Sequence, residues 1–166
     1  PGPDRVAPPC PYYYAPLAKD WCGGCNIQHL SYPAQLKTKL DILKDALHKI
    51  AHLRPELLLP VAGTANPETQ AWRYRNKIQM PYAHSDDGKS VRSGFYAPSS
   101  HRIVEINDCL IHPETMSRIT THIRQKMQTC MLTPYSEQKH SGWLRHTIVR
   151  TSQNAAQVLV TLVTTD

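Results

Sequence analysis

Two stretches of the chain repeat their apolar residues at helical spacing. In the first, the apolar positions follow at steps of four and three residues and share one face of a helix: Leu36, Leu40, Leu43, Leu47 and Ile50. Ser31 as the N-cap and Pro33 in the first turn predict where this helix begins. We expect it to end near Leu53.

The second helical stretch runs from Pro113 to about Met131. Its apolar stripe consists of Met116, Ile119, Ile123, Met127 and Cys130. Because Cys130 lies on this stripe, we interpret it as a small buried core residue.

Several segments alternate at the period of a β-strand. In "WRYRNKIQMPY", apolar and aromatic residues are expected on one side and polar residues on the other: Trp72, Tyr74, Ile78, Met80 and Tyr82 against Arg73, Arg75, Lys77 and Gln79. An Asp-Gly turn leads to two more strands, in "VRSGFYA" and "HRIVEI". Near the end of the chain, "WLRHTIVRT" and "AQVLVTLVT" predict a hairpin across "SQNA".

This order of elements predicts an α+β fold, an antiparallel sheet with two main helices on one face. Residues 1–29 are rich in proline and contain three cysteines, so we expect a coil that a metal site fastens. Residues 56–70 read as a connection. The expected division is a Cys-rich segment, 1–29, followed by one structural unit, 30–166.

The chain has a formal net charge of +6 and a pI near 9.2, which favours an anionic partner. It has no apolar run of the roughly 18 residues that a membrane span needs, and no signal-peptide pattern. It begins without methionine and finishes on an apolar strand, so we expect a piece of a longer protein.

Five cysteines without a secretion signal favour metal or redox chemistry over disulfides. Cys22 and Cys25 form a Cys-Gly-Gly-Cys turn, but no strand precedes it as in thioredoxin-like redox sites. With Cys130 set aside, Cys10 and Cys109 complete a set of four candidate ligands. Four thiolates suit tetrahedral zinc or an iron–sulfur cluster, and the isolated distant Cys109 favours the cluster, with zinc as the alternative.

Four motifs in order, "CGGCNIQHLSYPAQLKTK", "WRYRNKIQMPY", "GFYAPSSHRIVEINDCLI" and "LRHTIVRTS", resemble the central domain of the TrmA/RumA family of RNA (uracil-5-)-methyltransferases. The resemblance is greatest to the 23S rRNA branch, which carries a 4Fe–4S cluster. It implies that the cluster ligands are Cys10, Cys22, Cys25 and Cys109. Eleven residues separate Cys10 from Cys22, more than the family usually has.

The resemblance also implies an N-terminal barrel and a C-terminal methyltransferase domain that binds S-adenosylmethionine, neither of which this sequence contains. In that family the cysteine nucleophile and the carboxylate base belong to the methyltransferase domain. We therefore assign no catalytic residue here, and we do not expect this chain to methylate RNA by itself. As a family member it would be cytoplasmic and monomeric, without a membrane partner.

RNA, and 23S rRNA in particular, is the partner that the resemblance implies. Basic and aromatic residues on strands and at a hairpin tip are the candidate contacts: Arg73, Arg75, Lys77, Phe95, Tyr96, His101, Arg102, Arg145 and His146. For the basic stripe of Arg73, Arg75 and Lys77, a solvated sheet face is the simpler explanation. Phe95 could equally be a core residue. His29, His101 and His146 share no metal-ligand spacing.

Two other functions remain open from the sequence. A zinc-stabilised RNA-binding module would need the same four cysteines but no methyltransferase parentage. A ferredoxin-like electron carrier would need reversible reduction, and the basic charge argues against it.

Overall fold

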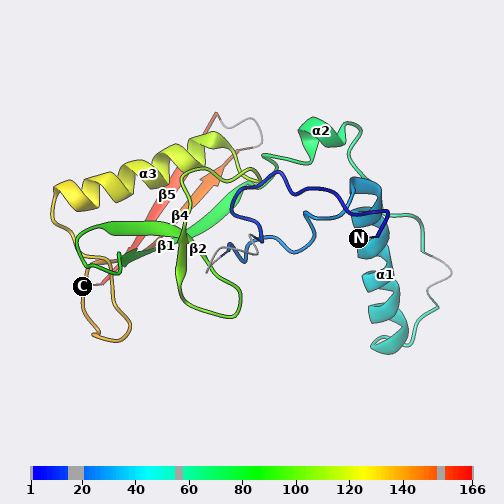
Figure 1. The fold of residues 1–166 in the computed structure, drawn as a ribbon, viewed down its shortest axis with the longest axis horizontal. Coiled ribbons are helices and arrows are strands. Elements are labelled where there is room, and N and C mark those ends of the chain that lie inside the picture. The colour runs from blue at the N-terminus through cyan, green and yellow to red at the C-terminus, as the bar shows by residue number, and fades with distance from the viewer. Residues whose placement is uncertain (1, 15–20, 55–57, 153–155, 166) are drawn as a thin grey trace. The chain divides into compact units, whose positions relative to one another are not determined.

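Five strands form one antiparallel sheet in the order β3–β2–β1–β4–β5 (Figure 1). They are β1 (Lys77–His84), β2 (Val91–Tyr96), β3 (Ile103–Glu105), β4 (Leu144–Thr151) and β5 (Val158–Thr164). The computed structural model describes residues 2–14, 21–54, 58–152 and 156–165. Most of the predicted "SQNA" turn, residues 153–155, lies outside the described residues.

The chain folds as two compact units. Unit 1 contains Pro1–Pro9 and Asn26–Ala71, and unit 2 contains Cys10–Cys25 and Trp72–Asp166. These boundaries differ from the expected division at residue 29. Unit 2 includes the whole sheet and all five cysteines, because the segment that bears Cys10, Cys22 and Cys25 joins the sheet rather than the neighbouring helix.

Helix α3 (Glu114–Thr129) covers one face of the sheet in unit 2. The predicted alternation of β1 is confirmed, since Ile78, Met80 and Tyr82 are all buried. They form one core with residues of β2, α3 and β4: Val91, Met116, Met127, Leu144 and Val149. The α+β class and the order of strands and helices are therefore confirmed.

Three expectations about these elements were wrong. Strand β1 begins at Lys77 rather than Trp72, and Tyr74 is exposed. Cys130 is exposed because α3 ends at Thr129, which leaves the cysteine as the C-cap. Among the described residues of unit 2, α3 is the one helix on the sheet, not one of two.

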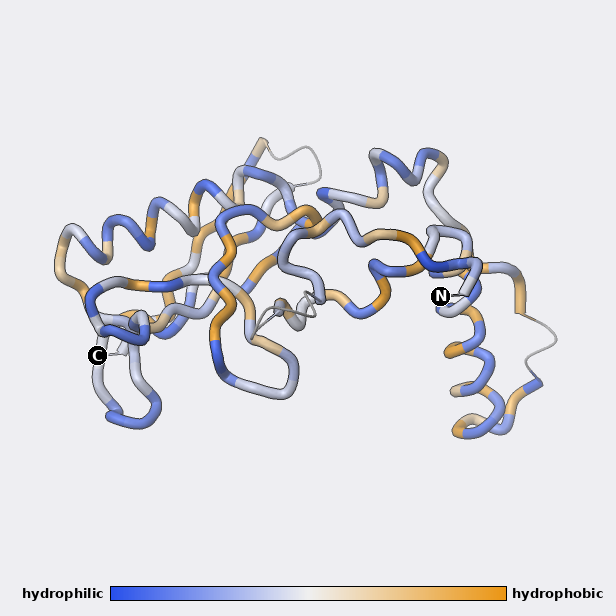
Figure 2. Tube along the Cα trace, in the orientation of Figure 1, coloured by the Kyte–Doolittle hydropathy of each residue, from blue (hydrophilic) through white to orange (hydrophobic). Residues whose placement is uncertain are grey.

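Unit 1 contains α1 (Tyr32–Lys49) and the short α2 (Pro67–Gln70). The predicted first helix is confirmed, but none of its residues is buried. In Figure 2, hydrophobic and hydrophilic residues alternate along it. The segment near residue 63 packs against α1, since a Cβ at Gly63 would lie 2.7 Å from a methyl carbon of Leu36. None of the described helices is long and apolar enough to cross a membrane.

Met127 and Met131 offer a matched test of the core of unit 2. Met127 is 1% exposed inside the core, whereas Met131 is 88% exposed. Replacing Met127 with Ala should lower the free energy of unfolding by about 2–5 kcal/mol, because a cavity remains. Met131→Ala should change it by no more than about 0.5 kcal/mol. Urea denaturation measures both, and equal effects would contradict this description of the core.

Candidate functional site

The side of the sheet opposite α3 carries polar side chains. Because successive residues of a strand point to opposite faces, the residues between the buried ones share this side. β1 pairs with β4 there, with Lys77 opposite Arg150, Gln79 opposite Ile148, and Pro81 opposite His146. We call the surface of these six residues, together with Arg145 beside His146, the open face.

A β-bulge in β4 changes which side chains reach the open face. Leu144 pairs with Thr164 of β5, and His146 pairs with the adjacent residue of β5, Val163. Arg145 is therefore the extra residue of the bulge. Leu144 and Thr147, on either side, are both fully buried. Strict alternation along the strand would place Arg145 and His146 on opposite faces, but because of the bulge both line the open side.

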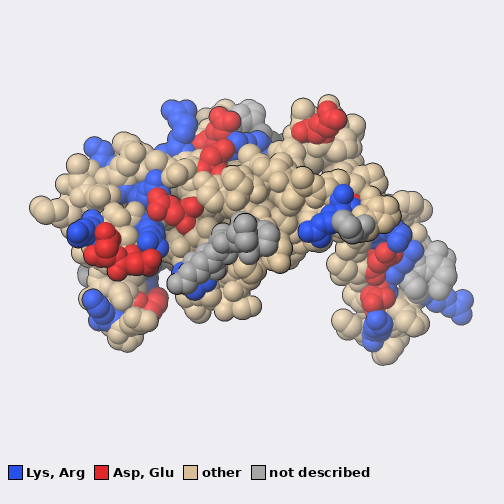
Figure 3. Space-filling model, viewed as in Figure 1, with Lys and Arg blue, Asp and Glu red and all other residues tan. Residues whose placement is uncertain are grey.

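Two basic side chains oppose each other at the other end of the open face. Lys77 and Arg150 are direct cross-strand neighbours and both are exposed. Like charges placed opposite each other repel, so an anion between them would relieve the repulsion. In the view of Figure 3, by contrast, basic side chains of unit 2 are interspersed with acidic ones.

The segment 133–143 forms a wall beside the bulge. Its backbone is attached to β4 by hydrogen bonds from the N–H of Tyr135 to the carbonyl of Leu144 (2.9 Å) and from the N–H of Leu144 to that of Thr133 (3.3 Å). Gly142 permits this close approach, since it has a φ of +113° and a Cβ there would lie 2.3 Å from the Pro134 carbonyl oxygen. Tyr135 is thereby positioned next to Arg145.

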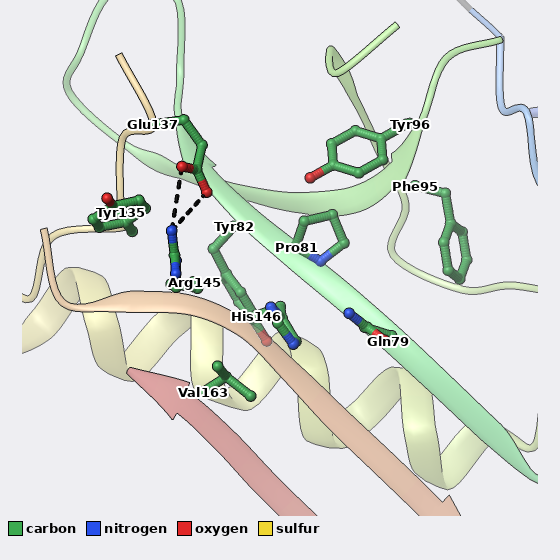
Figure 4. Close-up of a pocket in the computed structure, with 10 residues that line it drawn as sticks. All are labelled: Gln79, Pro81, Tyr82, Phe95, Tyr96, Tyr135, Glu137, Arg145, His146 and Val163. Atoms are coloured by element: carbon green, nitrogen blue, oxygen red, sulfur yellow. Dashed lines mark hydrogen bonds and ion pairs between the residues drawn. The ribbon is translucent and has the colours of Figure 1, made fainter. Parts of the chain in front are cut away.

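Arg145 lies at the centre of a pocket of about 470 Å³ (Figure 4). Its guanidinium carbon is 4.2 Å from the centre of the Tyr135 ring, a cation–π contact. It also donates to both carboxylate oxygens of Glu137, at 3.0 and 3.2 Å. Other lining residues come from β1, β2, β4 and β5: Gln79, Pro81, Tyr82, Phe95, Tyr96, His146 and Val163.

Four cysteines of unit 2 gather around a second, smaller hydrophobic cluster. Cys22 and Cys109 are buried in it with Ile106 and Ile111, and Cys25 packs against it. Cys10 lies close enough that its charge raises the pKa of Cys109. We call these four residues, Cys10, Cys22, Cys25 and Cys109, the cysteine group.

Burial changes the pKa of three thiols in the cysteine group. It raises the pKa of Cys10 and Cys22, and it raises the pKa of Cys109 to about 11. Reactive and redox-active cysteines have lowered pKa values instead. The N–H of Gly24 points at the Cys22 sulfur from 3.3 Å, a donor that would stabilise a thiolate. Cys10, Cys22 and Cys109 thus do not have the lowered pKa of reactive thiols.

Four sulfur donors at one hydrophobic cluster fit a group that four thiolates bind. Among the described residues, no three His, Cys, Asp or Glu side chains are placed to hold a single metal ion. In a 4Fe–4S cluster each thiolate binds a different iron, so its four sulfurs lie farther apart than four ligands of one ion.

Arg73 holds the segment that carries Cys109. It adopts a positive φ of 55°, uncommon for a residue with a side chain. Its guanidinium donates to both Asp108 oxygens, at 2.8 and 2.7 Å, and to the carbonyls of Cys109 and His112, at 2.8 and 3.0 Å. This pair lowers the pKa of Asp108 to about 2, an effect that Ser117 reinforces.

Arg75 also belongs to this region rather than to a strand stripe. Its backbone N–H donates to the carbonyl of Ile111 (2.8 Å), and its charge offsets a small part of the rise in the pKa of Cys22 that burial causes. The expected row of Arg73, Arg75 and Lys77 along one strand face is therefore not formed. Lys77 alone lies on the open face.

Glycine at position 23 links the cysteine group to the end of β2. The N–H of Gly23 donates to the carbonyl of Tyr96 (2.9 Å), and a Cβ at Gly23 would lie 2.9 Å from that oxygen. Only glycine permits this approach without displacing the backbone. The Cys22–Cys25 turn thus supports the residue whose ring forms one side of the Arg145 pocket.

The remaining predicted RNA contacts lie at or near the end of β2. Phe95 packs against both hydrophobic clusters, which favours the core interpretation, although it also lines the pocket. The His101 ring contacts that of Tyr96 edge-on, with the centroids 5.5 Å apart. Arg102 is exposed in the turn between β2 and β3.

Sequence reasoning missed the segment 133–143 and the role of Asp108. Tyr135 and Glu137 had no periodic pattern to identify them. The bulge did leave a signal, because three consecutive polar residues, Arg145, His146 and Thr147, follow Leu144 and interrupt the alternation.

Known proteins resemble this chain along nearly its whole length. The chain is 35% identical over 162 residues to an uncharacterized RNA methyltransferase of Halalkalibacterium halodurans. It is 39% identical over 166 residues to an uncharacterized RNA methyltransferase of Clostridium tetani. Nearly all of this chain is similar to part of an RNA methyltransferase. The alignments cover 98% and 100% of the chain but 33% of each relative, so it spans about a third of their length.

A solved structure shows the same fold. The Pyrococcus abyssi tRNA (uracil-54, C5)-methyltransferase, in complex with S-adenosyl-L-homocysteine, matches 99% of this chain and 33% of its own, with a TM-score of 0.63. The sequences are 24% identical, so the likeness supports the fold alone. No protein-family model matches the chain.

The Arg73 contacts predict a measurable contribution to stability. Arg73→Ala should lower the free energy of unfolding by about 1–3 kcal/mol, because it removes two charged bonds and leaves two carbonyls without their donor. Arg73→Lys should retain only part of this contribution to the free energy of unfolding, since an ammonium cannot bind in the same forked geometry. Urea denaturation measures the free energy of unfolding of both variants and of the wild type.

Arg92→Ala is the matched control for this prediction. Arg92 also bonds to both oxygens of an aspartate, but that partner, Asp86, is 89% exposed. Its removal should change stability by less than about 1 kcal/mol. If Arg73→Ala were no more destabilising than Arg92→Ala, the role assigned to Arg73 would be wrong.

Proposed function

We propose that this chain is the RNA-contacting, 4Fe–4S-binding central domain of an RNA (uracil-5-)-methyltransferase. The observation that carries the proposal is the similarity of nearly the whole chain to a third of proteins named as RNA methyltransferases. The parent enzyme would make 5-methyluridine in 23S rRNA, in the cytoplasm and as a monomer. S-adenosylmethionine and the reacting groups would belong to the rest of that enzyme, so this chain would not be catalytic.

The open face supports the RNA part of this proposal. It presents Lys77 and Arg150 at one end, and Arg145 and His146 with aromatic neighbours at the other. Phosphate contacts and stacking surfaces are what single-stranded RNA binding requires. The net charge of +6 favours the same partner.

The cysteine group supports the cluster. Cys10, Cys22, Cys25 and Cys109 would each supply one thiolate to it. Metal binding displaces the thiol protons, and its free energy would help to hold the Pro-rich segment that carries Cys10. Arg73 would keep the Cys109 segment in place, and Arg75 would offset part of the negative charge.

A zinc-stabilised RNA-binding module is the second candidate function. The same four sulfurs would have to move closer together to bind one zinc ion, which takes four thiolates in a tetrahedral arrangement. The long separation of Cys109 from the other ligands along the chain favours the cluster instead.

Metal analysis of the chain, purified without oxygen, tests the proposal. We expect about four iron atoms and four acid-labile sulfides per chain, with a brown colour. Cys109→Ser should lose most of both, whereas Cys130→Ser should keep them, because Cys130 is exposed at the end of α3.

Two outcomes would contradict it in different ways. One zinc per chain and no labile sulfide would replace the cluster with the zinc module. Equal iron loss in the Cys109 and Cys130 variants would show that the ligand set is wrong.

A further inference from the structure

The Arg145 pocket has the composition of a site for one nucleotide. Its volume of about 470 Å³ lies within the roughly 300–1,000 Å³ of typical ligand pockets. Figure 4 shows Tyr135 and Arg145 on one side of Pro81 and Tyr96 on the other. Aromatic rings and guanidinium planes are the groups on which unstacked RNA bases are held.

The polar groups of the pocket suit the edge of a base. Burial and the charge of Arg145 lower the pKa of His146, so its imidazole is neutral near pH 7. A neutral imidazole offers one donor and one acceptor, and the amide of Gln79 offers both as well. A base edge also combines donors and acceptors, and it can therefore pair with these two side chains.

Arg145 is arranged to accept a phosphate. One terminal nitrogen of Arg145 donates to both carboxylate oxygens of Glu137, yet the glutamate side chain is 75% exposed and that of Arg145 is 41% exposed. Ion pairs this exposed contribute little to stability. A phosphate also offers two or more oxygens to a guanidinium, so it can take the place of the carboxylate.

We propose that the Arg145 pocket binds one unstacked nucleotide of single-stranded RNA. The base lies against the Tyr96 ring with its edge toward Gln79 and His146, and a phosphate replaces Glu137 on Arg145. This inference rests on the proposed function, because it requires RNA as the partner.

Fluorescence anisotropy of the chain with a labelled single-stranded RNA of about 12 nucleotides tests the proposal. Tyr96→Ala and Arg145→Ala should each weaken binding about tenfold, and Tyr96→Phe should bind like wild type, because base stacking does not need the hydroxyl. Arg145→Ala should also lower the salt slope by about one.

Glu137→Gln provides a test that misfolding cannot imitate. Removing the competing carboxylate charge should tighten RNA binding by about two- to fivefold. Arg118→Ala is the matched control, since Arg118 is an exposed arginine of α3, on the covered side of the sheet. It should leave the affinity unchanged.

The outcomes separate this inference from the proposed function. If the chain binds the RNA but the Tyr96, Arg145 and Glu137 variants match wild type, the pocket is not a nucleotide site and the proposed function stands. If wild type binds no RNA, the proposed function fails as well. Tighter binding of free uridine monophosphate than of the RNA would overturn the inference in favour of a free nucleotide.

Discussion

The structure of unit 2 depends on one constraint, a sheet that is covered by a helix on one face only. Side chains of β1 and β4 alternate between the two faces, so burial of Ile78, Met80 and Val149 against α3 commits their neighbours to the other side. A shift of one residue in register would bury Lys77 and Gln79 and expose the core. The hydrophobic core thus determines which polar residues form the open face.

The bulge at Arg145 is a local exception to this alternation, and it adds a charge next to His146. The segment 133–143, attached to β4 through its backbone, then supplies Tyr135 and Glu137. The open face therefore combines two kinds of surface. One end carries the opposed charges of Lys77 and Arg150, and the other contains a pocket with aromatic sides.

The cysteine group is coupled to this face through the backbone. Gly23 hydrogen-bonds to the carbonyl of Tyr96, and Arg73 joins the Cys109 segment to the residues that lead into β1. A cluster at these cysteines would therefore hold the start of β1 and the end of β2. In this account its role is structural, and its loss would loosen the surface that we propose contacts RNA.

Periodic patterns predicted much of the fold, but not how its pieces come together. The strand alternation identified Ile78, Met80 and Tyr82 as core, and the helical stripe identified Met116 and Met127. Local patterns do not encode a bulge, an ion pair across 35 residues such as Arg73–Asp108, or where a helix stops. For this reason Cys130 was misplaced in the core, and Arg73 was expected on a strand.

The cysteine part of the site could be predicted, because closely spaced cysteines serve few other roles. The CxxC spacing of Cys22 and Cys25 pointed to the cysteine group, because paired thiols at this spacing are typical of metal sites. The pocket could not be predicted. Tyr135 and Glu137 belong to an irregular segment without a periodic pattern, and backbone hydrogen bonds place this segment beside the pocket. Gly142, which permits the two ends of that segment to approach each other, reads in the sequence as an ordinary turn residue.

The salt dependence of RNA binding tests most directly whether the open face contacts RNA. Lys77→Gln combined with Arg150→Gln removes two charges from this face, and Arg118→Gln combined with Lys126→Gln removes two from α3. The account predicts that the first pair lowers the slope of log affinity against log salt by about two, while the second leaves it unchanged. The reverse pattern would contradict the account, because it would place the RNA on the helical side.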